Sequence, residues 1–219
     1  MDYLLRILPP LIEGAGVTLG LFVVTLALSL PLGLALALAR LSRWGALRRA
    51  VSGFVWLMRG TPLMLHLLFV YYALPFVPVI GVRLPDYPAA VVAFTLNYAA
   101  YFAEILRAGI QSIDRGQVEA ARSLGLSYGR TMAHVVLPQA FRRMLPPLGN
   151  NAIALLKDSS LISAIGLAEL AYAARTVAGA YSRYWEPYLT ISLVYWVLTL
   201  GLAYAVKTLE ARYGRGDSR

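Results

Sequence analysis

The sequence predicts an all-α integral membrane protein with five spanning helices, in a single domain that covers residues 1–219. Hydrophobic residues make up 59% of the chain and charged residues only 14%, whereas soluble domains carry about 25% charged residues. Residues 14–39 contain no ionisable side chain, and a spanning helix needs only about 20 apolar residues. The chain has no cysteine, which excludes disulfides, thiolate nucleophiles and cysteine-based metal sites.

The five predicted spans follow the apolar runs of the chain, with Arg59 inside the second and Lys157 and Asp158 inside the fourth. Their approximate bounds are 12–39, 54–74, 88–108, 146–167 and 187–206. Residues 168–186 are too polar to lie in lipid, and their aromatic side chains suit a helix at the membrane surface.

The basic residues indicate how the chain lies across the membrane. The chain carries 20 lysines and arginines and a net charge of +9. Most of them fall between the first and second spans, between the third and fourth, and after the fifth. Because basic residues concentrate in cytoplasmic segments, these segments and the C-terminus are expected in the cytoplasm. The N-terminus is then expected outside.

The polar stretch between the third and fourth spans predicts two short helices. Asp114 is a suitable N-cap for a helix over residues 115–124. Gly125 is a suitable stop, since glycine adopts positive φ without a Cβ clash. Ser127 is expected to cap a second helix and Pro138 to end it. Two short helices with small residues on one face predict a surface that docks into another protein.

This stretch also carries a spaced motif, made of Glu119, Ala120, Ala121, Gly125, Val135, Leu137 and Pro138. It resembles the Glu-Ala-Ala loop of ATP-binding-cassette importer permeases. The single departure is Val135, which stands where that pattern has isoleucine, a change that keeps side-chain volume similar. The segments RGTPL (residues 59–63) and LKDSSL (residues 156–161) resemble the polar amino acid uptake branch of that family.

The resemblance implies a permease subunit that carries a polar amino acid into the cytoplasm across a bacterial inner membrane. Residues 110–143 form the coupling loop in this interpretation, and Glu119, Ala120, Ala121 and Gly125 contact the ATPase. The implied partners are an ATPase dimer, a second permease subunit and an extracytoplasmic amino-acid-binding protein. The chain has no Walker A pattern, so it is expected to hold no cofactor, and ATP and Mg are expected on the ATPase.

Polar residues inside the predicted spans are the candidate functional residues, because such residues are costly in lipid and usually face the bundle interior. Asn97, Tyr101 and Glu104 recur at helical spacing, on one face of the third span. The predicted substrate-binding residues, near the middle of the membrane, are His66, Asn97, Tyr101, Lys157, Asp158 and Ser160. Arg59 and Glu104 lie at similar depth nearer the cytoplasm and are interpreted as an ion pair or gate.

Two other functions remain as alternatives at this point. One is a small membrane enzyme, lipid-modifying or proteolytic, for which the two histidines have no evident acid partner. The Gly125–Gly129 match to G-x-S-x-G is a separate signal, but that motif requires a preceding strand, and none is predicted here. A passive channel subunit would not need a docking loop. The midplane polar residues also have a structural interpretation, in which they satisfy only each other and neighbouring helices. The sequence specifies neither the amino acid carried nor whether the paired permeases are identical.

Overall fold

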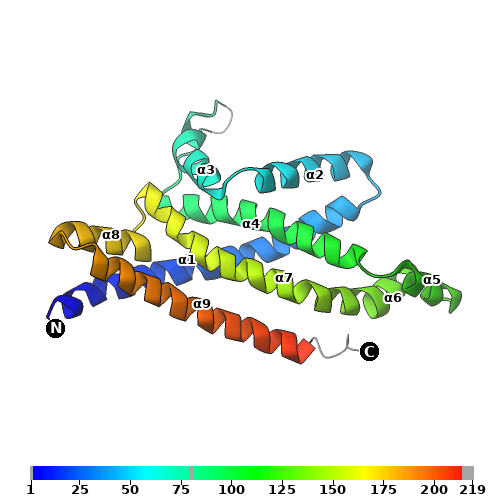
Figure 1. Ribbon diagram of the computed structural model, residues 1–219. Helices are drawn as coiled ribbons and strands as arrows, with labels where there is room; N and C mark the ends of the chain where they lie inside the picture. The colour runs from blue at the N-terminus through cyan, green and yellow to red at the C-terminus, as the bar shows by residue number, and fades with distance from the viewer. Residues whose placement is uncertain (1, 79–80, 214–219) are drawn as a thin grey trace.

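The computed structural model describes residues 2–78 and 81–213, and every regular element in these ranges is helical. The long elements are α1 (Asp2–Leu41), α2 (Gly45–Gly60), α4 (Asp86–Gln111), α7 (Leu137–Asp158) and α9 (Trp185–Tyr213). Helices α1, α4, α7 and α9 run side by side along the length of the molecule (Figure 1). The first turns of α1 and the last turns of α9 lie at opposite ends of this bundle.

The centre of the bundle is the contact between α1 and α4, and small residues make it close. A Cβ placed on Gly33 would lie 2.8 Å from Phe102 Cβ and 3.0 Å from the Ala99 carbonyl oxygen. On α4, Ala99 and Phe102 are completely buried. Membrane helices pack by such close approach of small residues, since lipid provides no hydrophobic force between them.

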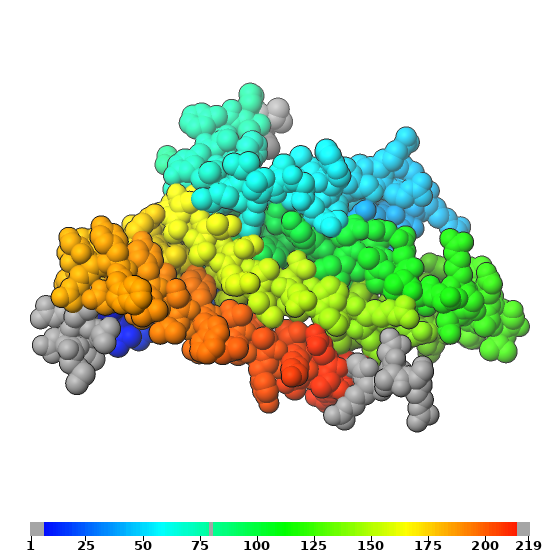
Figure 2. Space-filling view, in the orientation of Figure 1, coloured from blue at the N-terminus to red at the C-terminus, as the bar shows by residue number. Residues whose placement is uncertain are grey.

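The second predicted span is wrong as a single helix over residues 54–74. Helix α2 ends at Gly60, and α3 (Leu63–Leu68) begins after a bend of 106°. Thr61 is extended, with φ −125° and ψ 149°, because a residue that precedes proline is pushed out of the helical region. Short π and 3₁₀ turns, η1 (Phe69–Ala73) and η2 (Leu74–Phe76), prolong α3. The resulting arm rises away from the bundle (Figure 2).

The fourth predicted span also needs correction. Pro138 does not end the preceding helix, because it is the second residue of α7 and follows a π-helical turn that leads directly into this helix. Helix α6 (Tyr128–Thr131), the π-helical turn η3 (Met132–Val136) and α7 follow one another without a break. Helix α7 therefore begins before the predicted span of residues 146–167 and ends inside it, at Asp158. The 3₁₀ helix η4 (Ser159–Ile165) continues the chain from there. The change of helix type falls at Asp158, Ser159 and Ser160, residue types that compete for backbone hydrogen bonds and favour helix breaks.

By length and composition, three described helical segments are suited to cross a membrane: Ile7–Leu41, Asp86–Gln111 and Trp185–Tyr213. The bent pair of α2 and the arm makes a fourth if it crosses as one span. Helix α7 is not in this set, so the fold agrees with an all-helical membrane protein and does not establish five crossings. The basic tail after residue 213 lies outside the described residues.

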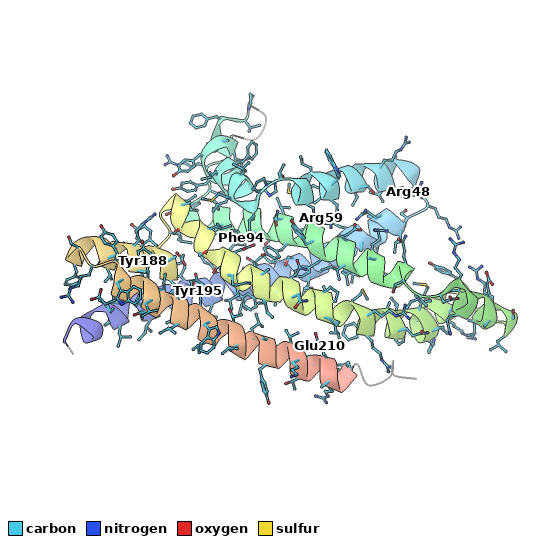
Figure 3. All side chains as sticks on the ribbon, viewed as in Figure 1. Arg48, Arg59, Phe94, Tyr188, Tyr195 and Glu210 are labelled. Carbon is cyan, nitrogen blue, oxygen red and sulfur yellow. The ribbon has the colours of Figure 1, made fainter. Side chains whose placement is uncertain are left out.

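The predicted surface helix is α8 (Leu170–Tyr181), and a buried carboxylate fixes its start. Glu169 is completely buried, and its Oε1 accepts the Tyr172 N–H at 2.7 Å as an N-cap. Its Oε2 accepts the Tyr195 hydroxyl of α9 at 3.1 Å and the Thr18 hydroxyl of α1 at 3.5 Å. Figure 3 shows Tyr195 on α9 where this helix passes α1. One carboxyl therefore ties three helices together.

Glu169 is expected to make stability depend on pH. Burial raises the pKa of the Glu169 carboxyl above its ordinary value of 4.5, although hydrogen bonds oppose this shift. A raised folded pKa favours the protonated folded state, so this stability is full below about pH 4.5 and is lost as pH rises through the folded pKa. Glu169→Gln, which mimics the protonated acid, should therefore gain melting temperature relative to the native protein between pH 4.5 and 7.5. The exposed Glu13→Gln is the control, and a pH-independent difference for Glu169→Gln would contradict the expectation.

Candidate substrate site and coupling surface

The predicted coupling loop projects beyond the other helices at one end of the molecule (Figure 2). Helix α5 (Arg115–Ser123) begins where expected, because the Asp114 side chain accepts the Gly116 N–H at 2.6 Å. It ends at Ser123, and Gly125, two residues on, has a φ of +76° in the left-handed region. The expected Ser127 cap is absent as a side-chain hydrogen bond, although α6 does start directly after this residue. Local sequence signals thus set the geometry of the first helix.

The four residues assigned to ATPase contact do not share one environment. Glu119, Ala120 and Gly125 are exposed, but Ala121 is only 4% exposed and packs inward. The Leu124 side chain is 83% exposed, because α5 ends at Ser123 and the chain turns away. With Tyr128, which is 67% exposed, Leu124 forms an apolar tip that the motif does not include.

The carboxylate of Glu104 is held by three arginines: the expected Arg59, Arg107 at the i+3 position of the same helix, and Arg40, which was not expected. Arg40 from α1 and Arg107 from α4 both contact it closely, each through a charge-assisted hydrogen bond. Arg59 is the more distant partner, with its Nη1 3.5 Å from Glu104 Oε2. The cluster joins α1, α2 and α4 around one negative charge.

Arg59 also contacts the next polar residue along α4. Its Cζ lies 5.5 Å from the centroid of the Tyr101 ring, a cation–π distance. Figure 3 shows Arg59 between α2 and α4. The predicted gate residues Arg59 and Glu104 therefore adjoin the predicted substrate residue Tyr101.

His66 and Asn97 meet at the bend between α2 and α3. The Asn97 amide donates to the Met58 carbonyl oxygen at 3.0 Å and lies 3.0 Å from His66 Nδ1. The other ring nitrogen of His66 lies 2.6 Å from the Thr61 hydroxyl. Asn97 is only 3% exposed. These contacts satisfy the carbonyl that the Pro62 break frees, which is the structural role that the sequence left open.

Asp158 has a partner that sequence reasoning missed. The Tyr98 hydroxyl of α4 donates to Asp158 Oδ2 at 2.7 Å. The Tyr98 and Tyr101 rings lie 6.3 Å apart, so Asp158 belongs to the same region as Tyr101. Lys157 is exposed, and the Ser160 hydroxyl donates to the Lys157 carbonyl oxygen at 2.9 Å. Among the described residues, Asp158 is the predicted substrate residue of this segment whose side chain makes a hydrogen bond to α4.

Two kinds of signal were available for the missed residues. Arg40 directly follows the first predicted span, and as a basic residue there it also fits the cytoplasmic charge pattern. Pro62 lies three residues after Arg59 and marks the bend by itself. Tyr98 carries no such signal, because its role depends on which helix lies beside α4.

The sequence of this chain matches a known protein family. Residues 29–215 match the family described as binding-protein-dependent transport system inner membrane component. The match covers most of the chain, including the Glu104 cluster, the coupling loop and Asp158. The chain belongs to this family. It is therefore a transport permease rather than an enzyme, which removes the alternative of a small membrane enzyme.

Individual relatives of this permease agree with that assignment. It is 39% identical over 210 residues to the arginine transport system permease protein ArtQ of Bacillus subtilis (strain 168), covering 96% of this chain and 95% of the relative. It is 39% identical over 205 residues to the glutamine transport system permease protein GlnP of Escherichia coli (strain K12), covering 94% and 93%. A crystal structure of an amino acid ABC transporter with histidines matches with a TM-score of 0.89 and 38% identity, covering 95% and 96%.

Proposed function

We propose that this permease carries a polar amino acid into the cytoplasm as part of an ATP-binding-cassette importer. The observation that carries the proposal is the projecting coupling loop, with a capped helix α5 and an exposed apolar tip at Leu124 and Tyr128. Relatives whose names specify arginine and glutamine transport support an amino acid as the substrate. Reconstitution tests it: vesicles that contain the permease and its ATPase should accumulate labelled L-arginine or L-glutamine only when ATP is supplied.

The proposed assembly has four kinds of partner. An ATPase dimer binds ATP and Mg and docks on the coupling loop, a second permease subunit completes the pathway, and an extracytoplasmic binding protein delivers the amino acid. The lipid of a bacterial inner membrane surrounds the permease. The largely exposed apolar surface of α9 suits lipid contact. Purification of the permease should bring the ATPase with it, whereas isolation of the permease alone under mild detergent would count against this assembly.

The proposed membrane arrangement has five crossings in one domain over residues 1–219, with the N-terminus outside and the C-terminus in the cytoplasm. Helix α7 with η4 supplies the fourth crossing, and α2 with the arm supplies the second as a broken span. An odd number of crossings is supported by α1 and α9, whose outer ends lie at opposite ends of the bundle (Figure 1). The coupling loop then lies at the cytoplasmic end, together with the end of α9.

The proposed substrate site lies between α4 and the junction of α7 with η4. Asp158 supplies an anion for a cationic group of the amino acid, and Tyr98 holds the carboxylate toward α4. His66, Asn97, Tyr101, Lys157 and Ser160 remain in the proposed site by position. A helix that changes type at this depth leaves backbone groups available to a polar ligand, as in transporters with discontinuous helices.

Asp158→Asn should weaken amino acid binding about ten- to a hundred-fold in the detergent-purified complex, because a charge-assisted contact contributes about 1.5–3 kcal/mol. Basal ATP hydrolysis should change little. The matched control is Asp86→Asn, because Asp86 also accepts a tyrosine hydroxyl, from Tyr71 at 2.9 Å, but lies at the first turn of α4. Calorimetry with L-arginine and L-glutamine gives the affinities. Native affinity in Asp158→Asn would show that Asp158 only anchors Tyr98.

A further inference from the structure

The Glu104 cluster contains more positive charge than it needs. Arg40 Nη1 contacts Oε2, and Arg107 Nη2 contacts Oε1, so both carboxylate oxygens have a close guanidinium partner. Arg107 Nε adds a third donor at 3.4 Å from Oε2. In residues 2–78 and 81–213, Glu104 is the only carboxylate within salt-bridge distance of these three arginines. The cluster therefore retains an excess of positive charge that an anion would neutralise.

Arg59 is the least engaged of the three arginines. Its side chain is 39% exposed, compared with 15% for Arg40 and 24% for Arg107. Its 3.5 Å approach to Glu104 is longer than a normal charge-assisted hydrogen bond. Within the described part of the chain, its guanidinium makes no hydrogen bond, and the Tyr101 ring positions it. An arginine held by a ring keeps its forked N–H groups available for a carboxylate.

The other donors near Tyr101 are already engaged. The Asn97 amide donates to the Met58 carbonyl oxygen and contacts His66, and the Tyr98 hydroxyl donates to Asp158. Neither group is free to receive a ligand carboxylate without breaking a buried contact, which costs about 1–3 kcal/mol. Arg59 is available at no such cost.

We propose that Arg59 binds the α-carboxylate of the transported amino acid. Arg59, Tyr101, Tyr98 and Asp158 form a continuous series of contacts, with a cation at one end and an anion at the other. The carboxylate of the amino acid binds the partly exposed Arg59, and a cationic or polar group of the amino acid is directed toward Asp158. Guanidinium and carboxylate pair through two parallel N–H···O hydrogen bonds. This assignment rests on the proposed amino acid transport function.

A ligand with and without the carboxylate tests the assignment. Calorimetry on the purified permease–ATPase complex compares L-arginine with L-argininamide, and L-glutamine with L-glutaminamide. The native complex should bind each acid roughly ten-fold or more tightly than its amide. In Arg59→Gln the affinity for the acids should fall by that factor, while the affinity for the amides stays nearly unchanged. Arg107→Gln, which removes a charge from the same Glu104, should keep the native ratio of acid to amide.

Three results would overturn the assignment. An Arg59→Gln complex that keeps the native acid-to-amide ratio would place the carboxylate elsewhere while leaving amino acid transport intact. A native complex that binds each amino acid and its amide equally would exclude any contact between the protein and the ligand's carboxylate. A native complex that binds neither, and whose vesicles take up no labelled polar amino acid with ATP, would overturn the proposed function as well. If Arg59→Gln does not assemble, Arg59→Lys replaces it. Lysine keeps the charge beside Glu104 but lacks the planar fork, so the ratio should fall several-fold, and an unchanged ratio contradicts the assignment.

Discussion

Leu124→Asp is expected to abolish ATP-driven uptake while the permease still folds and inserts. Leu124 is 83% exposed at the end of α5, so the change removes no internal contact. If the tip enters a groove of the ATPase, a charge there is desolvated without a partner, and loss of a central apolar contact typically costs 2 kcal/mol or more of binding free energy. Uptake in reconstituted vesicles and the amount of co-purified ATPase are the measurements.

The control for this experiment is the same substitution at another exposed leucine. Leu209 is 49% exposed near the end of α9, which lies toward the same end of the bundle as α5 (Figure 1). Leu209→Asp should retain most uptake. Ala121→Arg is a different case, because Ala121 is buried, and this variant should lower stability even without the ATPase. Uptake by Leu124→Asp close to the native rate, with a full complement of ATPase, would exclude the tip as the docking point.

Glu104→Gln is expected to destabilise the permease far more than Arg59→Gln. Glutamine leaves Arg40, Arg59 and Arg107 facing one another without a negative charge, and breaking a buried ion pair from one side costs about 3–5 kcal/mol. Because Glu104 keeps 22% side-chain exposure, the lower end of that range applies. Arg59→Gln removes a surplus charge and should cost well under about 1 kcal/mol, as expected of an exposed pair.

Exchanging the charges of Arg59 and Glu104 distinguishes an isolated ion pair from a three-arginine cluster. If Arg59 and Glu104 formed an isolated pair, Arg59→Glu with Glu104→Arg would restore stability. In the cluster, an arginine at position 104 faces Arg40 and Arg107, so the double variant should remain less stable than the native protein. Thermal unfolding of the four proteins in detergent measures this. Recovery of the native melting temperature by the double variant would contradict the three-arginine arrangement.

The features that were predictable from sequence are those with local causes. The cap at Asp114 and the positive φ at Gly125 depend on a few neighbouring residues, and both are confirmed. The bend at Pro62 also has a local cause, but the apolar run of residues 54–74 concealed it, because hydropathy is insensitive to a missing N–H. The prediction that Pro138 ends a helix was wrong because the π-helical turn before it allows the helix to continue.

The features that were not predictable depend on which helices are neighbours. Tyr98 and Asp158 are 60 residues apart, and Glu169 and Thr18 are 151 apart. Spacing along one helix places Asn97, Tyr101 and Glu104 on one face, but it does not indicate that Asn97 contacts the bend at Pro62 or that Glu104 meets Arg40. Such contacts follow from the packing of α1, α2, α4 and α7, which no single segment encodes.

Helices α6, η3 and α7 connect the coupling loop directly to Asp158 without an intervening loop. The 22 residues of α7 form a rod about 33 Å long at 1.5 Å per residue. A rod pivoting on α4 converts a tilt imposed at its coupling-loop end into an opposite displacement at its Asp158 end. The Tyr98–Asp158 hydrogen bond lies at that far end, so a stroke at the loop would stretch or release it. Pro146 and Pro147 lie inside α7 and remove two backbone N–H donors, so the helix can bend between its two ends and part of the force would be absorbed there.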